Sequence, residues 1–336
     1  MLTRRDFNAM VARAGLSAGL LAGCEQRREV PAAGGAGQPP ALRKITIGIV
    51  AKSQSNPVFL AARRGAESRA GELSKSEGLE VAIDWRTPND EDPQKQAEFI
   101  EQLVAAGVDA LTIACSDASK VTRTIDDAIA KGTIVMCFDS DAPESQRLCY
   151  VGTDDVDAGR SVMRNVAELL GDKAGVIAIL AGNQTATNLQ KRVHGAQEEL
   201  VRHANLTLKQ VYYHKETPQD AYAEVESVQK ANPEINGWAM IGGWPLMTER
   251  ALPWPPGEVA CVSMDTLRPE LSHIRRGDVQ VLLGQQYFRF GQQCVDILVE
   301  KVAHGKLPEK TIDFAPLDRV TRENVDEYEK NWDIWS

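Results

Sequence analysis

The sequence predicts an α/β protein of two doubly wound parallel-sheet domains. Short apolar runs, rich in β-branched residues, alternate with segments whose apolar residues recur every three or four positions. This alternation is the pattern of strands and helices in turn. The runs are almost continuously apolar, which is typical of parallel strands that helices cover on both faces. About nine such units exceed one typical doubly wound sheet, so two domains are the economical arrangement.

The expected strands begin soon after residue 43 and continue through most of the chain. Helical spacing between them is plain, for example where Val121, Ile125 and Ile129 recur every fourth residue. The strands are expected at 44–50, 79–85, 109–114, 133–138, 174–180, 207–213, 237–241, 258–264 and 279–283.

Composition and charge exclude several classes of protein. The 336 residues are 43% hydrophobic and 25% charged, which is ordinary globular composition and excludes disorder, collagen and coiled coil. The net charge is −9, and no run is rich in lysine or arginine, which argues against a nucleic-acid partner. No apolar stretch of about 18 residues follows the N-terminus, so no membrane span is expected.

The first 24 residues have the features of an export signal with a lipid-attachment site. Arg4 and Arg5 precede a short, weakly apolar run, and the pair resembles a twin-arginine signal, with the general export route as the alternative. The run ends in Leu-Ala-Gly-Cys, which resembles the bacterial lipobox, with Cys24 as the acylated residue. Residues 25–42 are rich in Gly, Pro and Ala and are expected to form a flexible tether. The mature protein is therefore expected on the periplasmic or cell-surface side, lipid-anchored to a membrane.

Five cysteines remain beyond Cys24, and they form no CxxC pair. Four lie in or beside apolar strand-like runs and one lies on a helical face, so we expect small buried hydrophobic side chains. The alternative is a disulfide between Cys115 and Cys137 on neighbouring strands. The remaining three are Cys149, Cys261 and Cys294.

Polar side chains and aromatic rings follow the expected strands, where parallel α/β sheets bind ligands. Carboxylates accept hydrogen bonds from hydroxyls, amides donate and accept, and rings offer flat apolar faces. This mixture predicts a polyol ligand, and the scarcity of cations makes phosphate a poor fit. The alternative for each polar residue is helix capping, for which Asp, Asn and Ser are favoured. The residues that follow the strands are Lys52, Ser53, Asn56, Phe59, Asn89, Asp90, Ser116, Asp117, Asp139, Ser140, Asp141, Asn183, Thr185, Asn188, Trp244, Asp265, Gln285 and Tyr287.

The sequence gives little support for an enzyme. Gly15-Leu16-Ser17-Ala18-Gly19 matches the nucleophile elbow of hydrolases, but it lies in the expected export signal, where the strand and helix that the motif needs are not expected. No GxGxxG follows a strand and no GxxxxGK[ST] occurs, so nucleotide cofactors lose support. The five histidines show no metal-ligand spacing. The candidate residues include no nucleophile–base pair. We therefore expect a binding protein without cofactor, metal or catalytic turnover.

Several segments, in order from about 43 to 330, resemble class I periplasmic sugar-binding proteins of the ribose-binding kind. They are IGIVAKSQSNPVFLAARRGAE, MCFDSDAP, YVGTDDVDAGR, VSMDT and LLGQQYFRFG. The lactose-repressor family shares this core but carries a helix-turn-helix in front, where this chain has an export signal. The resemblance implies two domains joined by a three-strand hinge, the periplasmic binding protein-like I fold.

The resemblance also implies roles for particular residues. In the first domain, Asn56 and Asp139 would hydrogen-bond the hydroxyls of a sugar, and Phe59 would stack on the sugar ring. Departures from the family pattern at Val58, Ser140 and the segment 242–244 indicate a pocket that is not ribose-shaped. The second domain and hinge would contribute Asn188, Arg192, Asp265 and Gln285, with Trp244 replacing a lost aromatic wall.

In this family the chain crosses between domains three times, and we expect crossings near Thr153, Gln285 and Asp313. The first domain would comprise 43–152 plus 286–313, and the second 153–285 plus 314–336. The implied function is to bind a monosaccharide or related polyol, close by hinge motion and deliver it to an ABC transporter permease. The first alternative is a ligand sensor for a histidine kinase or chemoreceptor. The second alternative is an exported oxidoreductase, but the sequence lacks the glycine motif with which such enzymes bind a dinucleotide cofactor.

The lipobox gives a direct prediction about membrane attachment. Cys24→Ser should move the protein from the membrane to the soluble fraction, because serine cannot form the thioether that carries the lipid. Fractionation followed by immunoblotting measures this, with Cys261→Ala as the matched cysteine control. A Cys24→Ser protein that stays with the membranes would contradict the assignment.

Overall fold

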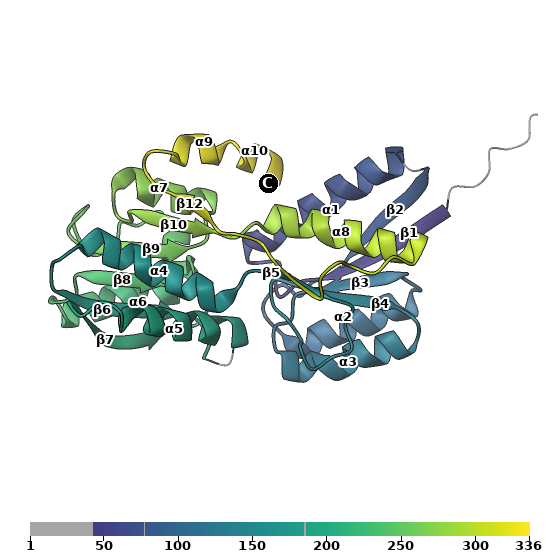
Figure 1. Ribbon diagram of the computed structural model, residues 1–336, viewed down its shortest axis with the longest axis horizontal. Coiled ribbons are helices and arrows are strands. Elements are labelled where there is room, and N and C mark those ends of the chain that lie inside the picture. The colour runs from purple at the N-terminus through teal and green to yellow at the C-terminus, as the bar shows by residue number, and fades with distance from the viewer. Residues whose placement is uncertain (1–42, 77, 185) are drawn as a thin grey trace, which may run out of the picture. The chain divides into compact units, whose positions relative to one another are not determined.

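The computed structural model describes residues 43–76, 78–184 and 186–336 (Figure 1). They form two six-stranded sheets, with strand orders β11-β5-β4-β3-β1-β2 and β12-β10-β9-β8-β6-β7. All neighbouring strands are parallel except β12, which runs antiparallel to β10. The predicted pair of doubly wound α/β domains is confirmed, with one antiparallel edge strand added. The export signal, Cys24 and the tether lie outside the described residues.

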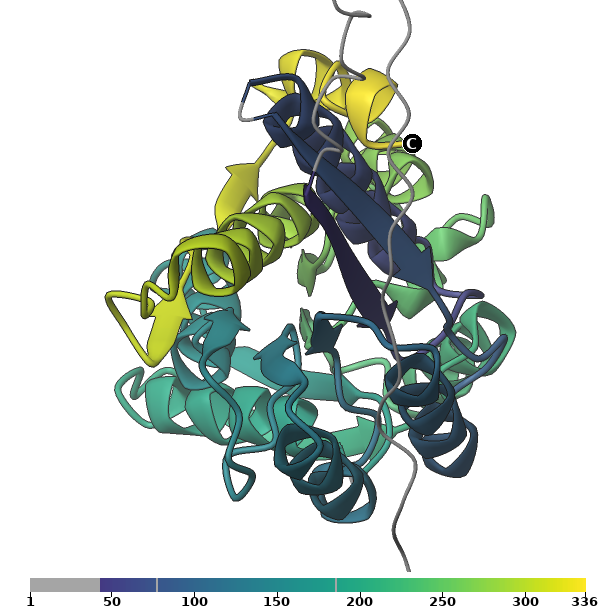
Figure 2. The same cartoon turned by 90° about the vertical axis from the view of Figure 1, so that its right-hand side faces the viewer.

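The first sheet carries the amino-terminal half of the described chain and one late strand. Its strands are β1 (Arg43–Val50), β2 (Leu79–Trp85), β3 (Ala110–Ile113), β4 (Ile134–Phe138), β5 (Tyr150–Gly152) and β11 (Ile312–Phe314). Its helices are α1 (Pro57–Ser76), α2 (Pro93–Ala105), α3 (Ala118–Ala130) and α8 (Tyr287–His304). In Figure 2 the late strand β11 lies beside β5 at the edge of this sheet.

The second sheet repeats the order of the first. Its strands are β6 (Gly175–Ala181), β7 (Leu206–Tyr213), β8 (Gly237–Met240), β9 (Ala260–Met264), β10 (Val281–Gly284) and β12 (Asp318–Val320). Its helices are α4 (Asp155–Leu170), α5 (Thr187–Leu200), α6 (Pro218–Ala231) and α7 (Arg268–Arg276), with the short 3₁₀ helix η1 (Trp244–Met247). Two short helices, α9 (Val325–Glu329) and α10 (Trp332–Trp335), end the chain.

Helix ends follow local sequence signals. The Asp92 and Asp154 carboxylates and the Thr217 hydroxyl accept hydrogen bonds from backbone N–H groups in the first turns of α2, α4 and α6. Gly277 and Gly305 end α7 and α8 in the left-handed region, with φ of 83° and 69°. These helices therefore begin or end at residues that local sequence defines.

All nine predicted strands are present, with ends within two residues of those expected. The strands that periodicity missed are β5, β11 and β12, which have three residues each. A run of three residues is too short to show a strand pattern in the sequence. These strands form because they pair with neighbouring strands of the folded sheet.

The chain passes between the two sheets three times, as Figure 1 shows. The first passage lies between β5 and α4, the second between β10 and α8, and the third between β11 and β12. Helix α8 packs against α1 and so belongs with the first sheet.

The five described cysteines are buried and form no disulfide with one another, which confirms their interpretation as small core side chains. The Cys115 and Cys137 sulfurs lie 3.9 Å apart, so the alternative disulfide is not formed. Cys294 accepts a hydrogen bond at 3.3 Å from the Thr112 hydroxyl, which joins α8 to β3.

Four glycines allow two helix pairs to pack with their backbones in contact. Gly65 and Gly291 lie between α1 and α8, and Gly159 and Gly195 lie between α4 and α5. A Cβ on any of the four would come within 1.9 Å of a carbonyl oxygen of the facing helix. These carbonyls are backbone atoms and cannot swing aside, so glycine is required at each position.

This packing predicts the effect of one added methyl group. Gly195→Ala should lower the free energy of unfolding by about 1–3 kcal/mol or more, because α4 and α5 must separate. The control is Gly71→Ala on the open side of α1, where a Cβ meets no atom within 4 Å. That change should instead stabilise by about 0.5–1 kcal/mol through helix propensity. Urea unfolding measures both, and equal effects of the two changes would refute the close-packing argument.

Candidate functional site

The Gln285 side chain, directly after β10, uses all of its hydrogen-bonding capacity. Its Oε1 accepts from Thr153 Oγ1 at 3.0 Å and from Arg192 Nη2 at 2.9 Å. Its Nε2 donates to Asp265 Oδ1 at 3.0 Å and to Tyr287 Oη at 2.7 Å. An amide offers two donors and two acceptor lone pairs, so no capacity remains. This one side chain joins the first and second passages between the sheets.

Asp139 and Asp265 occupy equivalent places, directly after β4 and β9. Both have positive φ, 57° and 71°, a region that Asp tolerates better than most residues. Both are buried. Asp139 Oδ1 accepts from Tyr287 Oη at 3.1 Å, and Asp265 Oδ2 accepts from the Gly243 N–H at 3.4 Å. The two carboxylates therefore meet the same group of side chains from the two sheets.

A buried ion pair stands behind this network. Arg192 Nε donates to Asp155 Oδ1 at 2.8 Å, and Nη1 donates to the Ile241 carbonyl at 3.3 Å. Burial opposes the charge of Arg192, but nearby carboxylates, Asp155 first, raise its pKa. Burial also raises the pKa of Asp155 and of Asp265, with the Arg192 charge as the main opposing cause. The charges at the site thus depend on one another for stability.

Lys52, at the end of β1, brings a second buried cation to the site. Its Nζ lies 3.9 Å from Asp139 Oδ2. Burial lowers the pKa of Lys52, but Asp139, with smaller contributions from Glu91 and Glu216, outweighs this and raises it. The ammonium group makes no hydrogen bond within the described part of the chain, so its donors remain open.

A cleft of about 800 Å³ opens between loops of the two sheets, within the size range of small-molecule sites. Its walls come from the carboxyl ends of β1 and β2 on one side and of β6, β7 and β8 on the other. On the first side they are Ser53, Ser55, Asn56, Asp90 and Glu91. On the second side they include Asn183, Tyr213, His214, Lys215, Glu216, Trp244 and Met247.

Trp244 is packed in the core of the second domain, 8% exposed, and also lines the cleft. Its ring meets His214 edge-on, with centroids 5.2 Å apart. A Cβ on Gly242 would lie 2.1 Å from the Trp244 ring, so the sequence Gly-Gly-Trp makes room for the indole to fold back. One flat ring among polar groups suits a ligand with hydroxyl edges and a C–H face.

The eight predicted ligand residues divide into three sets. Asp139, Arg192, Asp265 and Gln285 are joined in the buried network described above. Asn56 and Trp244 line the open cleft. The remaining two behave as interior residues.

Phe59 is buried and packs edge-on against Phe138 and Tyr287, with centroids 6.4 and 6.1 Å apart. Asn188 is also buried, and its side chain makes no hydrogen bond to the described residues. The predicted stacking and hydrogen-bonding roles of these two residues therefore stay predictions.

Two residues of the network are not among the eight predicted ligand residues. Tyr287 joins Asp139 to Gln285, and Asp155 neutralises Arg192. Tyr287 is among the residues that follow the expected strands, but no ligand role is predicted for it. Asp155 is an acidic residue in the first turn of α4, and only its contact with α5 reveals its role.

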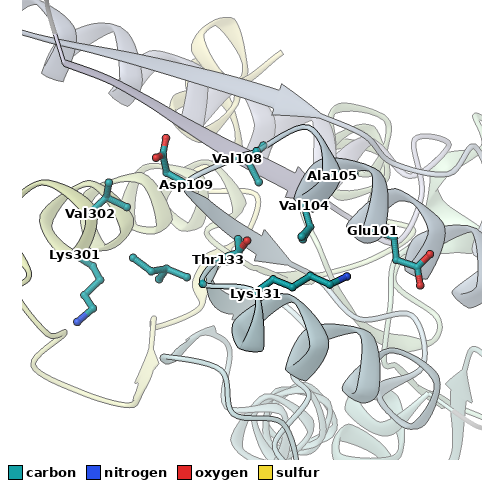
Figure 3. Close-up of a pocket in the computed structure, with 12 residues that line it drawn as sticks. Glu101, Val104, Ala105, Val108, Asp109, Lys131, Thr133, Lys301 and Val302 are labelled. Carbon is teal, nitrogen blue, oxygen red and sulfur yellow. The ribbon is translucent and has the colours of Figure 1, made fainter. Parts of the chain in front are cut away.

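A second cavity, of about 550 Å³, lies on the first domain (Figure 3). Its lining includes Glu101, Lys131 and Lys301, together with Asp109, whose Oδ2 accepts from the Thr46 N–H at 2.7 Å. The cavity lies at the amino ends of β3 and β4. Parallel α/β sheets bind ligands at the opposite ends of their strands, so this cavity is not the candidate site.

The described residues contain neither a metal-binding cluster nor a helix that could cross a membrane. No group of three or more His, Cys, Asp or Glu side chains there is arranged to hold a metal ion. In the same ranges, no helix has both the length and the apolarity to cross a bilayer.

Comparison with known proteins places this geometry in a family. The family model for the periplasmic binding protein domain matches residues 47–307. The ribose import binding protein of Bacillus subtilis is 25% identical over 281 residues, 83% of this chain and 88% of that protein. The D-ribose/D-allose-binding protein of Pseudomonas aeruginosa is 28% identical over 165 residues, about half of each chain.

Solved structures share the fold. An ABC transporter solute-binding protein from Burkholderia graminis, in complex with D-arabinose, matches with a TM-score of 0.78 at 22% identity, covering 85% of this chain and 98% of its own. A periplasmic ribose ABC transporter from Conexibacter woesei matches with a TM-score of 0.74 at 21% identity, covering 88% and 98%. Because the family model spans most of the chain and the fold agrees, the protein belongs to the periplasmic binding protein family.

Proposed function

We propose that the protein binds a monosaccharide or related polyol in the cleft and delivers it to an ABC importer. The observation that carries this proposal is the cleft itself, which lies at the carboxyl ends of both sheets and combines the Trp244 ring with hydroxyl, amide and carboxylate groups. The sugars in the names of the relatives and in the Burkholderia complex support the same ligand class.

The buried network is the second half of the proposed site. Asp139 and Asp265 each accept hydrogen bonds, as carboxylates that bind sugar hydroxyls must. In the structure Tyr287 Oη donates to one of them, and the Gln285 amide donates to the other. A sugar hydroxyl that enters would replace or extend these donors without leaving a carboxylate unpaired. We therefore assign both aspartates as ligand residues, with Asn56 and Trp244 on the open side.

The three chain passages are proposed as the hinge. Domain boundaries at 152/153, 285/286 and 313/314 would place them between the two units that close on the ligand. The Gln285–Thr153 hydrogen bond links two of these passages, at 3.0 Å. Closure would then be guided by a side chain that also contacts the ligand-binding aspartates.

Delivery to an importer is favoured over a sensor role, because the relatives include import binding proteins by name. The proposed location is outside the cytoplasm, on a lipid anchor at Cys24. No catalytic turnover is proposed, so a bound sugar should be recovered chemically unchanged after incubation.

The site assignment predicts the outcome of two conservative substitutions. Asp139→Asn and Asp265→Asn should each weaken sugar binding at least ~10-fold, since loss of a charge-assisted hydrogen bond costs about 1–3 kcal/mol. Asparagine tolerates positive φ as aspartate does, so the fold should be retained. A thermal-shift screen of monosaccharides and polyols would identify the best ligand, and calorimetry would measure its affinity.

The matched control is Asp109→Asn, which changes a carboxylate of the first domain outside the cleft. It should leave the affinity unchanged. If Asp139→Asn and Asp265→Asn lower only the melting temperature and keep the affinity, the two aspartates are structural and the assignment is wrong.

A further inference from the structure

Glu91 and Glu216 occupy equivalent positions on the two sides of the cleft. Glu91 lies between β2 and α2, and Glu216 lies between β7 and α6, so each follows the strand at one edge of its sheet. Both line the cleft. Within the described residues neither forms a salt bridge.

The backbone holds Glu216 in place at the cleft. Its Oε1 accepts a hydrogen bond at 2.9 Å from the Asn183 N–H. A Cβ on Gly182 would lie 2.7 Å from the same oxygen, so the chain leaves room there for the carboxylate. The position of this charge is therefore fixed by the turn that follows β6.

The two carboxylates interact with each other across the cleft. Water reaches Glu91, but the surrounding protein removes part of its solvation and raises the pKa of its carboxyl to about 7. Lys52 opposes this shift, while Glu216 and Asp139 add to it. The Lys52 ammonium lies 3.9 Å from Asp139 and interacts also with Glu91 and Glu216, so one cation faces three carboxyl groups. The cleft is left with negative charge on both sides.

A second observation points to a ligand at the same place. Ser53 lines the cleft and is 3% exposed, yet its hydroxyl makes no hydrogen bond within the described part of the chain. Because Ser53 lines the cleft, this hydroxyl is open to a polar group that arrives with a ligand. Ser53 follows Lys52 directly, which places this group beside the charges described above.

We propose that the ligand is a sugar or polyol that carries an ammonium group, and that Glu91 and Glu216 bind this group from the two sides of the cleft. The proposal rests on the proposed function, because it names the ligand class of the same site. Closure over a neutral sugar would confine the carboxyl groups of Asp139, Glu91 and Glu216 with the one ammonium group of Lys52, in a medium where the repulsion among carboxylates grows. An ammonium group on the ligand offsets that repulsion and donates to Glu91 and Glu216.

Other charged ligands fit the cleft less well. A carboxylate or phosphate ligand would meet Asp90, Glu91 and Glu216 along the same walls. A bound metal ion would need more ligands than this pair, and the described residues hold no cluster of three. A free divalent cation is therefore an arm of the test.

The test compares sugars that differ only at one nitrogen. D-glucosamine, D-glucose and N-acetyl-D-glucosamine are titrated by calorimetry at pH 7, and the galactose series repeats the comparison. The amino sugars should bind about tenfold or more tightly than the neutral and acetylated forms. Acetylation keeps the nitrogen and removes the charge, so it separates charge from size.

Variants locate the effect. Glu91→Gln and Glu216→Gln should each reduce the preference for the amino sugar over its neutral partner by about tenfold. Glu101→Gln removes the same charge from the first domain at the second cavity, and it should leave the preference unchanged. Equal effects of the three variants would show only a long-range field and would overturn the assignment.

The pH dependence gives an independent measurement. Between pH 6 and pH 7 the ionised fraction of Glu91 rises roughly fivefold, so D-glucosamine should bind up to about fivefold more tightly at pH 7. Of the other groups facing the cleft, burial lowers the pKa of His214, and Lys52 stays charged. Asp90, Lys215 and Glu216 complete the charged groups on these walls. Glu91→Gln should flatten the profile, and a profile that persists in this variant would overturn the role of Glu91.

The outcomes distinguish failure of the ammonium assignment from failure of the proposed sugar-binding function. Tighter binding of the neutral sugars, or equal binding, would overturn the ammonium assignment and leave the proposed function intact. Neutral sugars that bind equally well once CaCl₂ is added would assign the carboxylates to a free cation instead. If no sugar of either kind binds, both the ligand class and the proposed function are wrong.

Discussion

The rest of the site depends on the saturated amide of Gln285. Its four hydrogen bonds connect the passage at Thr153, the buried Arg192, the carboxylate of Asp265 and the hydroxyl of Tyr287. Each bond satisfies a group that would cost about 1–3 kcal/mol if it were left buried and unpaired. A ligand that enters this network must therefore replace one partner with another of the same kind, which restricts it to molecules with well-placed hydroxyls.

The two halves of the chain use the same devices. The aspartates after β4 and β9 both adopt positive φ, and the fifth residue of both α4 and α8 is a glycine in backbone contact with a neighbouring helix. The halves differ where those two helices begin. Asp155 begins α4 and pairs with Arg192, whereas Tyr287 begins α8 and reaches Asp139. The repeat builds the cleft, and this difference gives its two sides unequal chemistry.

Sequence predicted most of the fold because nine strands are long enough to show an apolar run, whereas β5, β11 and β12 form only through their neighbours. For the site, the expectation that ligand residues follow the strands selected Asp139 and Asp265, and the structure joins both in one network. The rule could not show that Phe59 packs against Phe138 or that Asn188 is buried, because burial depends on contacts between distant segments. Asp155 was missed for the same reason, since its partner Arg192 lies on α5.

Charge distinguishes this site more sharply than its hydroxyl-binding groups do. The buried network holds three carboxylates, on Asp139, Asp155 and Asp265, against the two cations Lys52 and Arg192. Burial raises the pKa of two of these carboxyls, and the Arg192 charge is the main cause that opposes this shift. The carboxylates of the cleft walls add to the same excess. In the proposed closure the domains bring these groups together and exclude water, so the free energy of closure would depend on the charge that the ligand contributes. In the proposed complex, hydroxyls satisfy the hydrogen bonds of the site and an ammonium group offsets part of its negative charge.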